Sequence, residues 1–155
     1  MNRILALNKK FSKYPFGKKL FSKFVARIAP YFITIKPVIE EIRPNYIEVS
    51  MPKRKAVHNH LKTVHAIAMC NLCEFAAGIC VEASIPKHRR WIPIGMRVKY
   101  LKKAKTNLIG VCELGQPDWD NIKELDCFVS VIDEDQVEVM TANIQMKISE
   151  KPAKA

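Results

Sequence analysis

Acidic side chains are missing from the start of this chain. The first 39 of its 155 residues contain no aspartate or glutamate. The same stretch carries nine basic residues: Arg3, Lys9, Lys10, Lys13, Lys18, Lys19, Lys23, Arg27 and Lys36. The whole chain has a formal net charge of +11. Such a surplus does not determine a fold, but it predicts negatively charged partners: nucleic acid, anionic lipid or a phosphorylated ligand.

Aromatic residues are also scarce, at 8% of the chain, and they do not alternate with the basic clusters. The stacking platform typical of single-strand binding is therefore missing, and nucleic acid is the disfavoured partner. No uncharged apolar run reaches about 18 residues, the length of a membrane-spanning helix. We find no internal repeat and no low-complexity segment. With 48% hydrophobic and 26% charged residues, the chain is typical of one folded domain that buries roughly 70% of its unfolded surface.

The chain has five cysteines, an odd number. Its first residues contain only a short apolar patch, Met1–Leu7, which is too short for the core of a signal peptide. We therefore expect no secretory leader, reduced thiols and a cytoplasmic location. Cys70 and Cys73 lie one helical turn apart, but a structural zinc site needs four ligands and no second such pair exists. We interpret both cysteines as small buried residues and expect no metal.

Residues 1–30 are predicted to form a basic amphipathic helical segment that Pro30 ends. From Gly17 onward, one face collects the apolar side chains Leu20, Phe21, Phe24, Val25 and Ile28. The other face collects Lys18, Lys19, Ser22, Lys23 and Arg27. The favoured interpretation is a helix that packs on the domain with a solvated basic face. The alternatives are contact of residues 17–29 with a membrane surface, and a transit peptide, which the excess of lysine over arginine disfavours.

The remainder, residues 31–149, is predicted to be one domain followed by a disordered tail, 150–155. Two extended runs, 33–42 and 46–51, predict a hairpin. A helix of about five turns over 64–83 is apolar on nearly every side and is therefore expected to be buried. Four strands follow, over 91–101, 106–114, 126–133 and 136–149. Strands on both sides of one apolar helix predict an α+β fold in which an antiparallel sheet of about six strands wraps around the helix. Because one sheet leaves edges uncovered, we expect a homodimer or a dimer of dimers.

The central helix carries one acid, Glu74, and a polar entrance with Asn59 and His65. Glutamate is rarely buried unless it is paired or functional. A desolvated carboxylate is a stronger base, which suits it to activate water. Three alternatives stay open: Glu74 lies at a wet dimer seam or pairs with a lysine, His65 only caps the helix, and Asn59 bonds either the acid or its own loop.

This spacing resembles the hotdog-fold thioesterases related to phenylacetyl-CoA thioesterase. In that family an Asn precedes a His-Gly-Gly at the helix start, and a carboxylate follows nine positions after the His. Asn59, His65 and Glu74 match these places, and Leu72 stands two before the acid, as in the family. Ala66 and Ile67 replace the two glycines, as in an uncharacterised branch with a relaxed motif. The resemblance in element order covers about residues 33–149.

The resemblance implies hydrolysis of an acyl-CoA or another acyl thioester, with coenzyme A as part of the substrate and no separate cofactor. Glu74, His65 and Asn59 would be catalytic, and the backbone N–H groups of Ala66 and Ile67 would bind the thioester oxygen. The other expected substrate-binding residues are His60, Arg89, Arg90, Lys102 and Lys103, the last four through the phosphates of the nucleotide.

Three other functions remain, and one of them is a basic membrane-surface protein that its N-terminal helix anchors. A non-catalytic acyl-CoA or fatty-acyl binding protein would follow if Ala66 and Ile67 close the oxyanion position. A dehydratase resembling the hotdog β-hydroxyacyl dehydratases would use His60, fourteen positions before Glu74. Those enzymes continue with Phe-Pro-Gly after the His, whereas Leu61-Lys62-Thr63 follow here. The Asp-to-His signature of the hotdog hydratases is also missing, because no aspartate precedes Asp118.

Overall fold

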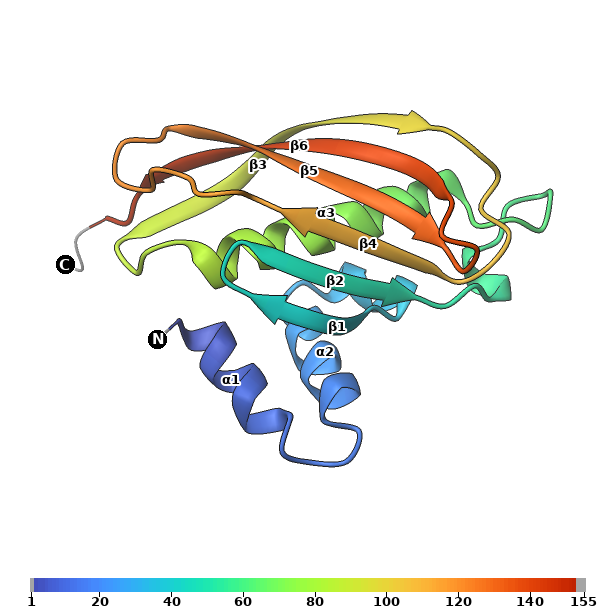
Figure 1. Ribbon diagram of the computed structural model, residues 1–155, viewed down its shortest axis with the longest axis horizontal. Helices are drawn as coiled ribbons and strands as arrows, with labels where there is room; N and C mark the ends of the chain where they lie inside the picture. Colours follow the sequence, from blue (N-terminus) through green and yellow to red (C-terminus); the bar gives the residue numbers. More distant parts are fainter. Residues whose placement is uncertain (1, 153–155) are drawn as a thin grey trace.

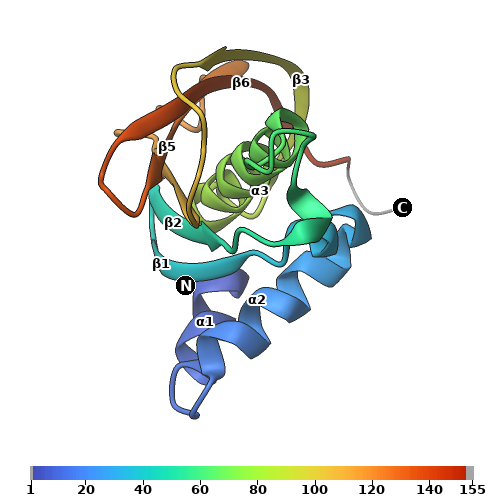
Figure 2. The same ribbon diagram turned by 90° about the vertical axis from the view of Figure 1, so that its right-hand side faces the viewer.

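A six-stranded antiparallel sheet curls around one long helix, with two further helices beside one sheet edge (Figures 1 and 2). The computed structural model describes residues 2–152. The elements in chain order are α1 (Arg3–Phe11), α2 (Gly17–Ile28), the 3-10 helix η1 (Pro30–Ile35), β1 (Val38–Arg43), β2 (Tyr46–Met51), the 3-10 helix η2 (Lys55–Val57), α3 (Ala66–Ser84), β3 (Arg89–Tyr100), β4 (Leu108–Glu113), β5 (Glu124–Asp133) and β6 (Glu138–Glu150).

The strand order is β1-β2-β4-β5-β6-β3, so β1 and β3 are the edges of the sheet. The predicted α+β architecture and all six strands are confirmed. The main difference is local: residues 33–35, predicted to begin the first strand, form part of η1. β6 includes Glu150, the first residue of the predicted tail, and residues 153–155 lie outside the described residues.

α3 forms the core of the domain, as its apolar composition predicts. Leu72, Cys73, Ala76 and Val81 are 0% exposed. By length and hydropathy alone α3 is able to cross a membrane, but core helices of soluble proteins pass the same test, and 61% of its apolar 18-residue window is buried. All five cysteines are free thiols. Within residues 2–152, no three histidine, cysteine or acidic side chains gather in a way that could hold a metal ion.

The N-terminal segment contains two helices where the sequence indicates one. α1 begins after Asn2, whose side chain accepts a hydrogen bond from the Ile4 N–H (2.9 Å). The turn into α2 brings Gly17 so close to α1 that a Cβ there would lie 1.9 Å from the Phe11 carbonyl oxygen. Glycine is therefore required for this helix pair. Both helices lie beside β1, on the opposite side of the molecule from β3 (Figures 1 and 2).

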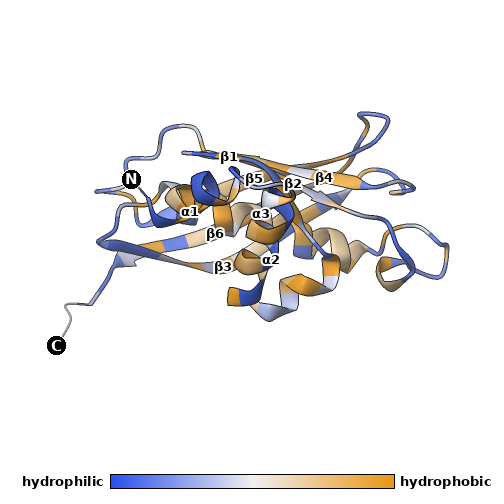
Figure 3. Cartoon of the chain, turned by 90° about the horizontal axis from the view of Figure 1, so that it is seen from below, coloured by the Kyte–Doolittle hydropathy of each residue, from blue (hydrophilic) through white to orange (hydrophobic). Residues whose placement is uncertain are grey.

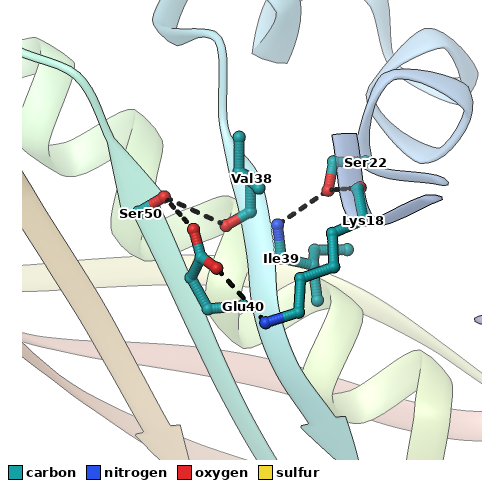
Figure 4. A network of polar contacts seen from close by, with 6 residues as sticks. All are labelled: Lys18, Ser22, Val38, Ile39, Glu40 and Ser50. Atoms are coloured by element: carbon teal, nitrogen blue, oxygen red, sulfur yellow. Dashed lines mark hydrogen bonds and ion pairs between the residues drawn. The ribbon is translucent and has the colours of Figure 1, made fainter. Parts of the chain in front are cut away.

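α2 packs on β1 through a face that differs from the predicted one. Phe21 and Val25 are buried as expected, but Ser22, predicted on the solvated basic face, is 1% exposed. Its hydroxyl donates to the Lys18 carbonyl (2.7 Å) and accepts the Ile39 N–H of β1 (2.7 Å; Figure 4). Leu20, Phe24 and Ile28, predicted on the packing face, remain exposed. The packing face is thus rotated toward Ser22, because β1 offers an unpaired N–H there.

Replacing Ser22 with alanine is expected to lower the free energy of unfolding by about 1–3 kcal/mol, because the buried Ile39 N–H loses its acceptor. Chemical denaturation of the two proteins measures this difference. Ser12→Ala is the matched control, since the Ser12 hydroxyl bonds only an exposed carbonyl and its loss should change stability very little. Equal stability of the Ser22 variant and the native protein would mean that this hydrogen bond does not hold α2 on the sheet.

Candidate functional site

A cavity of about 220 Å³ opens at the N-terminus of α3. We call it the helix-start cavity. Three segments far apart in the sequence build its wall: η1, the loop around η2 and the first turns of α3. The lining residues are Tyr31, Thr34, Ile35, Ala56, Val57, His58, His65, Ile67, Ala68 and Asn71. The start of the central helix, where the sequence predicts the oxyanion position, is therefore reachable from outside.

His65 caps α3, as one of the two predicted alternatives has it, and its catalytic role stays a prediction. Its Nδ1 atom accepts the backbone N–H of Ile67 (3.1 Å). This corrects the assignment of Ile67 to the thioester oxygen, because an N–H has one proton and His65 already holds it. Among the hydrogen bonds of residues 2–152, none engages the N–H groups of Ala66 and Ala68. These two free donors, at the positive end of the helix dipole, are what remains for a carbonyl oxygen.

Asn59 is hydrogen-bonded within its own loop. Its Oδ1 atom accepts the N–H groups of Leu61 (2.9 Å) and Thr63 (3.1 Å), and its Nδ2 atom donates to Thr63 Oγ1 (2.8 Å). It therefore bonds its own loop and not Glu74. These bonds shape the loop that carries His58 and leads into His65, which favours a positioning role, and the catalytic role of Asn59 stays a prediction. His60, on the same loop, is exposed and does not line the helix-start cavity.

Two polar residues of the cavity were missed in the sequence. The His58 Nε2 atom is buried and has no partner among the described residues. Asn71 is 7% exposed, and its Nδ2 atom donates to Thr34 Oγ1 (3.1 Å). Asn71 carried a usable signal, because it is a polar residue in an apolar helix, as Glu74 is. His58 carried none, because only the folded loop distinguishes it from its neighbour His60.

Glu74 lies on a stripe of α3 that the sheet leaves partly open, together with Ile67 and Cys70. Its carboxylate forms no hydrogen bond or ion pair within residues 2–152, which removes the lysine-pair alternative. The Cys70 Sγ atom lies 3.5 Å from the Tyr100 hydroxyl oxygen of β3. This hydrogen bond, with burial, raises the pKa of Tyr100 to about 12, so the phenol stays protonated at neutral pH. The stripe therefore borders the second half of edge strand β3.

One chain does not assemble the predicted catalytic set. His65 and Glu74 are nine residues apart on one helix, which corresponds to about 14 Å along its axis. Glu74 also does not line the helix-start cavity. A direct contact between the acid and the helix start therefore requires a second chain.

The predicted phosphate-binding residues divide into two groups. Arg89 is 7% exposed, and its guanidinium donates to the carbonyls of Asp120 (3.1 Å) and Ile122 (2.6 Å). This corrects its assignment, because a buried and engaged arginine cannot bind a surface ligand. Arg90 is exposed. Lys102 and Lys103 are exposed on the loop where the Ala104 carbonyl accepts the Val64 N–H (2.9 Å), next to the helix start. Arg90 lies at the other end of β3, and a strand of this length separates it from Lys102 by on the order of 40 Å.

Mutation of the two neighbouring arginines should affect stability very differently. Arg89→Ala is expected to lower the free energy of unfolding by about 2–3 kcal/mol, because two charge-assisted hydrogen bonds to the 120–122 loop are lost. Arg90→Ala is the matched control and should leave stability within about 0.5 kcal/mol. Denaturation curves of both variants measure this. A stable Arg89 variant would contradict its structural role.

Comparison with known proteins adds three findings. A family model described as a domain of unknown function (DUF4442) matches residues 17–148. Among curated proteins none matches the chain. A solved structural-genomics protein, APC5556, is 40% identical, with 96% of this chain and 99% of that chain covered and a TM-score of 0.84.

Two more distant solved structures carry a description of activity. PA5026 from Pseudomonas aeruginosa, a protein of unknown function described as a probable thioesterase, has a TM-score of 0.77 at 16% identity over 89% of this chain and 97% of that chain. Thioesterase HI1161 from Haemophilus influenzae has a TM-score of 0.73 at 9% identity over 89% of this chain and 94% of that chain. These neighbours have the hotdog fold, so the predicted fold is confirmed.

Proposed function

Because the chain belongs to the DUF4442 family and has the hotdog fold of these thioesterases, we propose that it is an acyl-CoA thioesterase that works as a homodimer. One observation carries the proposal: an open helix start with two free N–H donors and an unpaired carboxylate lie on the same helix, beside a free sheet edge. Thioester hydrolysis needs both groups, one to polarise the carbonyl and one to activate water.

The edge strand β3 supplies the reason for a dimer. Its first half is poorly suited to pairing, because Pro93 has no N–H and a bulge lies between Pro93 and Gly95. Its second half, 96–100, runs beside the N-terminal half of α3, as the contact of Tyr100 with Cys70 indicates. Pairing two such halves about a two-fold axis would bring the N-terminal halves of the two α3 helices together. Glu74 of one chain would then face the helix start of the other.

The same pairing would join the basic residues that one chain separates. In an antiparallel register centred near Val98, Arg90 of one chain falls opposite residue 106 of the other. It would thus lie near the loop with Lys102 and Lys103. A nucleotide that carries several phosphates fits such a cluster, because arginine and lysine are the usual phosphate ligands.

In the proposed reaction, the thioester carbonyl accepts hydrogen bonds from the N–H groups of Ala66 and Ala68. Glu74 of the second chain takes a proton from a water molecule, whose oxygen adds to the carbonyl carbon. Collapse of the tetrahedral intermediate breaks the carbon–sulfur bond. The products are a carboxylic acid and the thiol of coenzyme A, which receives the proton.

The test is thiol release from a panel of acyl-CoAs of increasing chain length, read with a thiol reagent, together with light scattering at micromolar concentration. We expect turnover with at least one chain length and a dimer or a larger species. A folded monomer would count against the proposed site. The second candidate, a non-catalytic acyl-CoA binding protein, is favoured by the Ile67 side chain, which stands 56% exposed at the helix start. Binding of acyl-CoA without thiol release from any panel member would establish it.

A further inference from the structure

The outward face of α2 carries large apolar side chains that the fold covers only in part, Phe24 through stacking on Phe11 of α1. Leu20, Phe24 and Ile28 recur every four residues and are 52%, 47% and 71% exposed. Three more large exposed side chains flank the helix in sequence: Tyr14 and Phe16 before it and Tyr31 after it. We call these six residues the α2 face. Large apolar side chains gathered on one surface mark a site of interaction.

A basic row runs beside the apolar row on the same helix. Lys19, Lys23 and Arg27 recur with the same spacing, one position earlier, and all three are exposed. None of them forms an ion pair with a residue in 2–152, whereas Lys18, on another side of the helix, pairs with Glu40 (3.5 Å). Figure 3, viewed from below, shows hydrophobic and hydrophilic residues following each other along α2. The two rows together present an apolar strip bordered by uncompensated positive charge.

We propose that the α2 face docks on an anionic lipid surface. A helix with an apolar strip and a lysine-rich border lies well in the plane of a membrane, its apolar side chains among the acyl chains and its basic side chains at the headgroups. Charge decides against a second copy of the chain as the occupant, because a two-fold contact on this face would oppose one basic row to the other. Buried Phe21 and Val25 hold the helix on the sheet, so docking requires no refolding.

Docking has a consequence for the helix-start cavity. Tyr31 belongs both to the α2 face, at 68% exposure, and to the lining of the cavity. A membrane bound at the α2 face would therefore lie next to the cavity. This consequence, unlike docking itself, rests on the proposed function: it favours substrates whose long acyl chains partition into lipid.

Vesicle flotation of the full chain tests docking without reference to activity. We use vesicles of phosphatidylcholine and phosphatidylglycerol in about a 2:1 ratio, and vesicles of phosphatidylcholine alone. The native protein should bind the anionic vesicles and not the neutral ones, and added salt should weaken binding. The triple variant Lys19→Gln, Lys23→Gln, Arg27→Gln should lose affinity on the order of a hundredfold. The triple variant Leu20→Gln, Phe24→Gln, Ile28→Gln should lose at least about tenfold.

Two controls make the result specific. The variant Lys87→Gln, Lys123→Gln, Lys147→Gln removes the same charge from exposed positions outside the N-terminal helices and outside residues 96–100 of β3, and should bind nearly as the native protein does. Phe128→Gln removes a 63% exposed apolar side chain from β5 and should have no effect. The proposal is overturned if the native protein ignores anionic vesicles, or if the control lysines matter as much as the basic row. It is also overturned if the apolar variant only reduces the oligomer size in solution, since the α2 face would then join copies of the chain.

Discussion

Glu74→Gln is expected to lower kcat for thioester hydrolysis by about two orders of magnitude or more, because it removes the base that activates water. The substitution keeps the size of the side chain. Since the Glu74 carboxylate has no partner within residues 2–152, its replacement leaves no other group unpaired. The melting temperature should therefore stay unchanged or rise. Thiol release from the best acyl-CoA of the panel measures the loss.

Glu82→Gln is the matched control, because Glu82 is the other acid of α3. Its Oε2 atom accepts the Trp91 indole N–H (2.9 Å), and a glutamine oxygen is able to accept the same bond. Turnover of this variant should remain within about twofold of the native value, as expected for a residue away from the reaction. If the Glu74 variant keeps native turnover, Glu74 is not the catalytic base and the proposed mechanism fails.

Mixing two inactive variants is expected to restore activity, because each proposed site takes its acid from one chain and its helix start from the other. The first variant is Glu74→Gln. The second, Ala68→Phe, fills the helix-start cavity and should abolish turnover by itself. In a mixed dimer, one site contains both defects and the other contains neither. Random pairing should therefore recover about a quarter of the native activity per chain.

The measurement is thiol release after the two variants are unfolded together, refolded and compared with each variant treated alone. Circular dichroism and the melting temperature must first confirm that Ala68→Phe folds. If it does not, Ala66→Leu offers a second way to crowd the same donors. If two folded, dimeric variants recover almost no activity on mixing, the proposed shared site is wrong. The acid and the helix start would then act within the same chain, or one of them would not belong to the site.

Much of the fold could be predicted from local pattern, because alternation and apolar runs reflect which side of each element is buried. The predicted central helix, 64–83, differs from α3 (Ala66–Ser84) by two residues or fewer at each end. Five of the six strands lie within two residues of their predicted bounds for the same reason, whereas β1 begins five residues later than predicted, at Val38. The first helix was missed because it has only nine residues and its start signal, Asn2, stands at the edge of the chain.

The roles of single polar residues depended on tertiary structure, since a side chain's partner often lies far away in the sequence. Arg89 and Arg90 are equivalent as a sequence pair, yet successive residues of a strand point to opposite faces, and the 120–122 loop lies on only one of them. Ser22 is buried because β1 presents the Ile39 N–H at that point. His58 and Asn71 meet at one cavity because η1 and the loop around η2 close over the start of α3.

The sequence by itself therefore determined the α+β wrapping of a sheet around one apolar helix, and the presence of a lone acid within that helix. Only the tertiary structure decided that the Arg89 guanidinium binds the 120–122 loop, that Ser22 accepts the Ile39 N–H, and that Glu74 lies outside the helix-start cavity. The physical reason is that burial periodicity is a property of each segment, whereas a hydrogen-bond partner and a distance are properties of how segments meet.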